Sequence, residues 1–248
     1  MKYYFLLTVS YDGYNYNGWA KQPNLKSTIQ GQLEYALSMF CQTKMFTTAA
    51  ASRTDTHVHA IDQKVKIELD FLPNIKKMYA GLNKILPLDI QVKNIELISK
   101  DFDVRGSILK KYQFQIMTTR PGVFDAKYYQ YCDEQFFDFK KFKKAILVFK
   151  GEHNFRNFIA LKRDEIVGKD TNRVIDSIRV KKFGNKIFIE FTAKGFLKHQ
   201  IRIMLGAAIA HSNGKIELQD IFDVLNLRKD KMDYIAEGKG LFLKKIIY

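Results

Sequence analysis

The sequence predicts an α+β protein made of two similar α/β halves. Strand-like and helix-like apolar patterns alternate through residues 1–104, and a second series of them fills residues 105–248. Apolar residues make up 46% of the chain, which is enough for a substantial core. No low-complexity linker or short repeat separates the two series, so we expect the halves to pack together without a flexible joint.

The first half is expected to contain three strands and two helices. Period-two alternation of apolar residues predicts strands over residues 3–9, 64–69 and 90–97. Ser27 and Gln30 resemble a capping box at the start of the first helix, and Asn74 is a suitable cap for the second. The apolar faces of these helices are formed by Ile29, Leu33, Leu37 and Phe40, and by Ile75, Met78, Tyr79, Leu82, Ile85 and Leu86.

The second half repeats the mixture of strands and helices. Strands are expected over residues 110–117, 175–180, 186–192 and 241–248. Phe183-Gly184-Asn185 indicates a hairpin between the middle two. Helical spacing predicts an amphipathic helix at 139–149, whose lysines are more typical of a solvated face than of an RNA contact. The run from 197 to 211 predicts a long helix covered on several sides, and 218–225 a further one.

Charge gives the first indication of function. The chain has 41 Lys and Arg against 26 Asp and Glu, a net charge of +15, so we expect a polyanionic partner. A general lysine bias is the alternative. Cys41 and Cys132 match no metal or redox spacing, which favours buried thiols in a reducing cytosol. We expect no signal peptide or membrane span.

The densest group of ionisable residues lies just before the second strand. Arg53, Asp55, His57 and His59 fall within seven residues. A nearby guanidinium favours the ionised form of a carboxylate, so Asp55 is a candidate nucleophile or base at neutral pH. A turn or a surface ion pair is the alternative interpretation. Two histidines two residues apart are a poor metal site without a third ligand.

An ordered series of motifs then resembles the TruA-type tRNA pseudouridine synthases. Arg53 to Ala60 resembles the Arg-Thr-Asp-Ala-Gly-Val-His-Ala loop of that family. Because the matches keep their order along nearly the whole chain, the resemblance is specific. The other matching segments are Tyr11 to Trp19, Thr28 to Glu34, Leu82-Asn83, Leu86 to Ile90, Lys111-Tyr112, Gly151 to Phe155, Phe196 to Arg202 and Gly240 to Leu243.

The resemblance implies isomerisation of uridine to pseudouridine in tRNA, at positions 38–40 of the anticodon stem-loop, without metal or cofactor. It implies Asp55 as the catalytic carboxylate, with Tyr112 stacking on the flipped-out uracil and Arg202 pairing with Asp55. Arg53 and Leu241 are expected to contact the extruded nucleotide, with Thr54 and His59 as further binding residues. It also implies ferredoxin-like or RRM-like halves whose sheets join around a central cleft, and a cytoplasmic homodimer with tRNA across both subunits.

Several alternatives stay open. Tyr112 alternates with Phe114 and Ile116, as a core residue does. An arginine such as Arg202 on an apolar helix needs an acidic partner in any fold. A catalytically silent RNA-binding protein, or a hydrolase using Asp55 with a histidine, would also fit parts of the pattern. Attack on C6, attack on C1′ and removal of the 2′ proton are all chemically possible for Asp55.

The chain departs from the family pattern at four positions. Ser52 replaces the glycine before the arginine, Thr56-His57 replaces Ala-Gly after the aspartate, and Glu237 replaces a proline. Glycine in a tight loop often provides positive φ, so His57 must either tolerate that conformation at a cost or change the loop. These departures favour a divergent paralogue with a different RNA preference.

Overall fold

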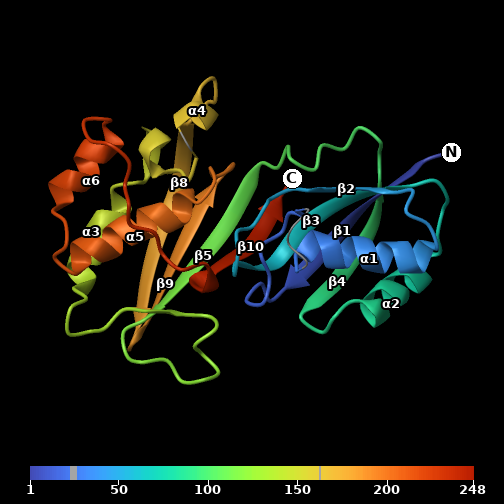
Figure 1. Cartoon of the computed structure of the whole chain (residues 1–248), viewed down its shortest axis with the longest axis horizontal. Coiled ribbons are helices and arrows are strands. Elements are labelled where there is room, and N and C mark those ends of the chain that lie inside the picture. Colours follow the sequence, from blue (N-terminus) through green and yellow to red (C-terminus); the bar gives the residue numbers. More distant parts are fainter. Residues whose placement is uncertain (23–26, 162) are drawn as a thin grey trace. The chain divides into compact units, whose positions relative to one another are not determined.

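The computed structural model describes residues 1–22, 27–161 and 163–248. The chain forms two compact units (Figure 1). Unit 1 comprises Met1–Ile108 together with Phe242–Tyr248, and unit 2 comprises Leu109–Leu241. The α+β prediction is confirmed, because each unit combines a β-sheet with α-helices. The division into domains at residues 104/105 stays a prediction.

The sheet of unit 1 is centred on two long antiparallel strands. β1 (Tyr3–Tyr11) lies between β4 (Ile90–Ile98) and β3 (His59–Leu69). The other edge of β3 is shared by two strands: β2 (Thr47–Ala50) pairs antiparallel with its later part, and β10 (Leu241–Ile247) pairs parallel with His59 and Ala60. The strands predicted at 3–9, 64–69 and 90–97 are therefore confirmed.

Alternation along these strands produces the core of unit 1. Phe5, Leu7 and Val9 are fully buried, as are Val65 and Ile67. Two helices cover this sheet, α1 (Ile29–Cys41) and α2 (Ile75–Ile85), and they contact each other (Figure 1). Because side chains of a strand alternate between its faces, the period-two pattern in the sequence marks the face under the helices.

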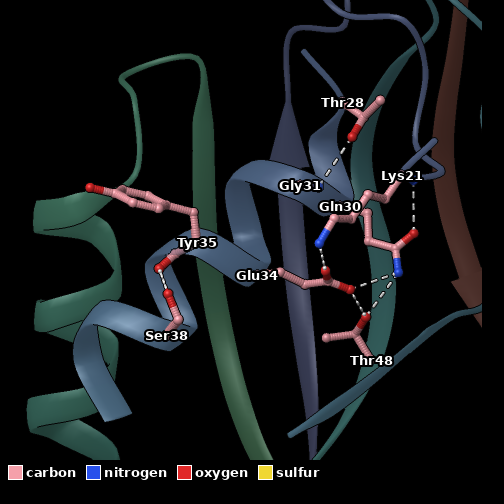
Figure 2. Close-up of polar contacts among 8 residues, drawn as sticks. All are labelled: Lys21, Thr28, Gln30, Gly31, Glu34, Tyr35, Ser38 and Thr48. Carbon is pink, nitrogen blue, oxygen red and sulfur yellow. Dashed lines mark hydrogen bonds and ion pairs between the residues drawn. The ribbon is translucent and has the colours of Figure 1, made fainter. Parts of the chain in front are cut away.

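The cap of α1 differs from the prediction. Thr28, not Ser27, is the N-cap, and its hydroxyl accepts a hydrogen bond from the Gly31 amide at 3.2 Å. Figure 2 shows that Gln30 does not reach back to the cap; its amide donates to Glu34 on the next turn. The capping box was wrong because Thr28 has extended backbone angles, which place its hydroxyl over the first turn.

Unit 2 contains its own run of antiparallel strands. Its strands follow the order β5 (Leu109–Met117), β9 (Lys186–Ala193), β8 (Asn172–Phe183) and β7 (Gly151–Asn154). The short β6 (Gln130–Tyr131) pairs parallel with β5. The predicted hairpin is confirmed: β8 and β9 are joined by Gly184, which has φ 56°, and Asn185.

Unit 2 contains an almost completely buried helix, α5 (Gln200–Ser212). Helix α3 (Phe139–Leu147) packs on α5 (Figure 1). The predicted helix from 197 begins only at Gln200, because His199 has a left-handed φ of 61°. The remaining elements are α4 (Arg163–Ile166), α6 (Leu218–Leu225) and the 3₁₀ turns η1 (Arg156–Phe158) and η2 (Gly238–Gly240). Within the described ranges, no helix has the length and apolarity needed to cross a membrane.

Candidate active site

Asp55 lies on the loop between β2 and β3 of unit 1, here called the Asp55 loop (residues 51–58). The loop begins where antiparallel pairing of the two strands ends, with the Ala51 amide donating to the Lys64 carbonyl at 2.9 Å. Arg53 is exposed and Asp55 is half-buried. The sequence prediction that these residues occupy a loop at a strand edge is confirmed.

Ser52, which follows Ala51, is held by the side chain of Gln63 at a point where no neighbouring strand pairs with it. The Ser52 amide donates to Gln63 Oε1 at 3.2 Å, and Gln63 Nε2 donates to the Ser52 carbonyl at 2.6 Å. Gln63 is fully buried on β3, in the same phase as Val65, Ile67 and Leu69. Both backbone groups of Ser52 are therefore satisfied although no strand continues there.

Thr54 is anchored through both its side chain and its backbone. Its hydroxyl lies 2.8 Å from the hydroxyl of Tyr11, at the end of β1. Its carbonyl accepts a hydrogen bond from the Trp19 amide at 3.0 Å. Tyr11, Trp19 and Thr54 are all buried, so these bonds are shielded from competing water.

The segment that follows β1, residues 12–19, supports the loop on the far side of Asp55. The His57 amide donates to the Tyr16 carbonyl at 3.2 Å, and the Val58 amide donates to the Asp55 carbonyl at 3.1 Å. Gly18 has φ 85°, and a Cβ built on it would lie 2.7 Å from the Thr54 carbonyl oxygen. Only glycine allows this close approach, which brings residues 12–19 against the backbone on either side of Asp55.

Tyr16 fixes residues 12–19 in turn to the rest of unit 1. Its hydroxyl donates to Asp89 Oδ1 at 2.7 Å, and the Asp12 amide donates to the Asp89 carbonyl at 2.9 Å. Burial first, and then the hydrogen bond to Asp89, raise the pKa of Tyr16 above its ordinary value. The phenol therefore stays protonated and serves as a donor across the physiological pH range.

His57 adopts the left-handed backbone conformation that glycine would take more easily at this position. Its φ is 64°, in the left-handed region that favours glycine. The exposed ring lies 5.6 Å from the ring of Tyr14 between centroids, and its Nδ1 is 2.5 Å from the Tyr14 carbonyl oxygen. Because a carbonyl only accepts, Nδ1 carries the proton of this bond and Nε2 is left facing away from it.

His59 is buried and belongs to the framework of unit 1. Its Nδ1 lies 2.9 Å from Asp12 Oδ1 and 3.1 Å from the Gly13 amide nitrogen. One nitrogen cannot donate to the first and accept from the second at once; the charge of Asp12 favours the form with the proton on Nδ1. The ring stacks on Phe242 of β10 with centroids 4.4 Å apart and an interplanar angle of 18°.

Tyr112 of unit 2 lies on β5 opposite Phe191 of β9. It shares its face of the strand with Phe114 and Ile116, which are fully buried, while Tyr112 itself is 9% exposed. Its ring meets Phe196 edge to face, with centroids 5.4 Å apart. The alternation read from the sequence is confirmed, and it places Tyr112 at the end of the buried row.

Arg202 lies on the first turn of α5 and is half-buried. Its Nε donates to the Ala236 carbonyl at 2.9 Å, and the Ala236 amide donates to the Arg202 carbonyl at 2.8 Å. Leu241, after η2, is buried. Tyr112, Arg202 and Leu241 belong to unit 2 and Asp55 to unit 1. The pairing of Arg202 with Asp55 stays a prediction.

His57 of the Asp55 loop and His59 at the start of β3 have different surroundings. His57 is exposed beside Tyr14, whereas His59 is buried against Asp12 and Phe242. Over residues 1–22, 27–161 and 163–248, no group of three or more His, Cys, Asp or Glu side chains is arranged to hold a metal ion.

The sequence interpretation overlooked the residues that support the loop. Gln63 and Tyr11 contact it through buried side chains, and Gly18 contacts it through its backbone. Gln63 could have been noticed, since it is a polar residue in the apolar phase of a predicted strand. Tyr11 and Gly18 lie in the segment from Tyr11 to Trp19 that resembles a family motif, but nothing in the sequence assigned them to support of the Asp55 loop.

Comparison with known proteins identifies the class. A sequence model of the family described as "tRNA pseudouridine synthase" matches residues 145–248. Proteins named tRNA pseudouridine synthase A match over nearly the whole chain. That of Mesoplasma florum is 36% identical over 250 residues, covering 98% of each chain. That of Mycoplasma mycoides subsp. mycoides is 37% identical over 247 residues, covering 99% of this chain and 98% of its own. The chain therefore belongs to the tRNA pseudouridine synthase A family.

Proposed function

We propose that the protein isomerises uridine to pseudouridine in tRNA, with Asp55 as its catalytic carboxylate. Family membership supports the reaction. The loop geometry supports the residue: Asp55 is half-buried, and the residues on both sides of it are fixed by hydrogen bonds to Gln63, Tyr11, Trp19 and Tyr16. A carboxylate that projects from a backbone fixed in this way is better pre-organised for reaction than one on a mobile loop.

The chemistry requires one bond to break and one to form at the same sugar carbon. The N1–C1′ bond of uridine breaks, the uracil turns, and a C5–C1′ bond forms; C5 loses its proton and N1 gains one. Asp55 would act at C6, at C1′ or on the 2′ proton. Extruding the nucleotide costs a few kcal/mol, and stacking on an aromatic such as Tyr112 returns about 1–3 kcal/mol.

The other predicted residues receive roles according to their surroundings. Arg53 is exposed beside Asp55 and is suited to contact the extruded nucleotide or its phosphates. Arg202 and Leu241 are proposed to complete the site, as the pairing partner of Asp55 and as an apolar contact. Thr54 and His59 are both buried. The Thr54 hydroxyl lies against the Tyr11 hydroxyl and His59 Nδ1 lies against Asp12, so we assign both residues to support of the loop.

The direct test is release of tritium from C5-labelled uridine in tRNA. The wild type should release the label, and Asp55→Asn should not. Asp101→Asn provides a matched control, since Asp101 is an exposed aspartate of the same unit. Equal unfolding midpoints for the two variants would confirm that both are folded. Activity that survives in Asp55→Asn would remove Asp55 from the mechanism.

The target uridine is proposed to lie at positions 38–40 of the anticodon arm, and the protein to act as a cytoplasmic homodimer with tRNA across both subunits. The left-handed His57, two residues after Asp55, favours the alternative of the same chemistry at another uridine. Mapping modified positions in tRNA transcripts decides between the two. Sedimentation of the protein with and without tRNA tests the dimer, whose tRNA affinity should fall steeply with added salt.

A further inference from the structure

Two strands share one edge of β3, and the Asp55 loop passes between them. β2 pairs with residues 65–68 of β3, and β10 pairs with His59 and Ala60. Between these stretches the Ala51 amide still reaches the Lys64 carbonyl, but the next residue has left the ladder. Gln63 therefore occupies the point at which the chain departs from the sheet on its way to Asp55.

The amide of Gln63 replaces the missing rung of the ladder. Its oxygen accepts from the Ser52 amide and its nitrogen donates to the Ser52 carbonyl, the pair of bonds that a neighbouring strand would supply. The reversed amide would set donor against donor and acceptor against acceptor, so Ser52 fixes its orientation. Because the side chain is fully buried, water does not replace either bond.

The same amide is linked to a second residue of the loop. Its nitrogen lies 3.5 Å from the Tyr11 hydroxyl, which lies 2.8 Å from the Thr54 hydroxyl. Ser52 and Thr54 are thus held from one buried cluster, and Asp55 follows directly. A shift of the Gln63 amide would move the backbone from which the Asp55 carboxylate projects.

We propose that Gln63, together with Tyr11, is a positioning residue for Asp55: it sets where the loop leaves the sheet and hence where the carboxylate stands against the nucleotide. The inference rests on the proposed function, in which Asp55 is catalytic. A misplacement of about 1 Å can lower a rate by about 100-fold, so these bonds should affect turnover far more than substrate binding.

A stabilising role alone would give a different result, and Asn83 provides the comparison. Asn83 Oδ1 accepts from the Val92 amide, and its Nδ2 donates to the Val92 carbonyl, both at 2.9 Å. It thus holds both backbone groups of one residue of β4, in the same unit but remote in sequence from the Asp55 loop. Asn83→Leu removes a similar pair of bonds, together with the bond from Asn83 Nδ2 to the Tyr79 carbonyl at 3.1 Å, without touching that loop.

The experiment compares Gln63→Met, Tyr11→Phe and Asn83→Leu in the full-length protein, well below their unfolding temperatures. We expect kcat for pseudouridine formation to fall about 10- to 100-fold in Gln63→Met and several-fold in Tyr11→Phe, with KM for tRNA changed less than about threefold. Asn83→Leu should lower the unfolding midpoint but keep kcat. A kcat loss below about threefold in Gln63→Met, a loss carried by KM, or an equal loss in Asn83→Leu would overturn the proposal. If Gln63→Met does not fold, Tyr11→Phe decides by the same criteria.

Gln63→Glu adds a readout that depends on hydrogen bonding. The ionised side chain can accept from the Ser52 amide but would oppose the Ser52 carbonyl, whereas the neutral acid can donate to it. The charged neighbours Asp62 and Lys64 lie on the other face of β3 and pair with each other at 2.9 Å. The titratable group bonded to the Gln63 side chain is the Tyr11 hydroxyl. Relative to wild type, kcat of Gln63→Glu should rise as the pH falls, while the ratio for Gln63→Met stays flat. A flat ratio for both would count against the proposal.

Failure of this inference is distinguishable from failure of the proposed function. If the wild type does not form pseudouridine, or if Asp55→Asn remains active, the proposed function fails. If the wild type is active, Asp55→Asn is inactive and Gln63→Met retains wild-type kcat, only the positioning role fails.

Discussion

Replacing His57 with glycine is expected to give a more stable protein than replacing it with alanine, the reverse of the usual order. At an ordinary position, glycine is less stable than alanine by about 0.5–1 kcal/mol, because the unfolded glycine chain has more freedom to lose. His57 has φ 64°, where a Cβ is strained by about 1–2 kcal/mol. Glycine escapes this strain and alanine does not.

The expected difference follows from these two terms. Both variants lose the bond to Tyr14 and the contact with its ring, so these losses cancel between them. Relief of strain minus the entropy of glycine leaves glycine ahead by about 0.5–1 kcal/mol. For a protein of this size the difference corresponds to about 2 °C in unfolding midpoint.

Urea and thermal unfolding of the two variants measure this difference. The neighbouring Thr56 is the control, because it is also exposed but has no positive φ. At position 56 alanine should be the more stable replacement, and at position 57 glycine. If alanine were the more stable replacement at both positions, the left-handed conformation of His57 would carry no strain and the reasoning would fail.

Three further predictions each concern a single residue. Thr48→Val should cost about 1 kcal/mol in urea unfolding, because its hydroxyl donates to Glu34 at 2.9 Å and accepts from Gln30 at 3.0 Å (Figure 2). Asp138 caps α3, and the hydrogen bond that it accepts from the Lys141 amide is the largest cause of its lowered pKa. The stability that the ionised cap contributes is therefore fully present above pH 3.8, its ordinary pKa, and is lost as the pH falls through the pKa that Asp138 has in the folded protein. Asp138→Ala should therefore lower the unfolding midpoint at neutral pH but not in acid. Burial raises the pKa of Cys132 to about 12, so iodoacetamide should label it at pH 8 only after unfolding.

Much of the fold could be predicted because strands and amphipathic helices produce periodic apolar patterns within short stretches of sequence. Alternation at residues 3–9 and 64–69 identified β1 and β3, and helical spacing at 218–225 identified α6. Boundaries were less predictable. The start of α5 depends on the left-handed His199, and a backbone angle of this kind leaves no periodic trace in the sequence.

The candidate site could be predicted only in part, for a related reason. The density of charge around Arg53 and Asp55 identified the loop, because those residues are neighbours in sequence. The bonds that hold the loop join residues more than ten positions apart, such as Ser52 with Gln63 and Tyr11 with Thr54. Pairings of this length depend on strand register, and here the register shifts between Val9 and Tyr11.

Two of the departures in the Asp55 loop, Ser52 and His57, replace a glycine of the family pattern, and they differ in their physical consequences. Ser52 has no positive φ, and it uses its backbone groups to bond Gln63, so a side chain there carries no strain. His57 is strained by about 1–2 kcal/mol, and an exposed hydrogen bond to Tyr14 returns about 1 kcal/mol at most. Strain that is not recovered within the fold is typical of functional positions. If the His57 ring selects the nucleotide beside Asp55, His57→Gly should change which uridines are modified while keeping turnover on its new set. An unchanged modification map would show that His57 has no part in target choice.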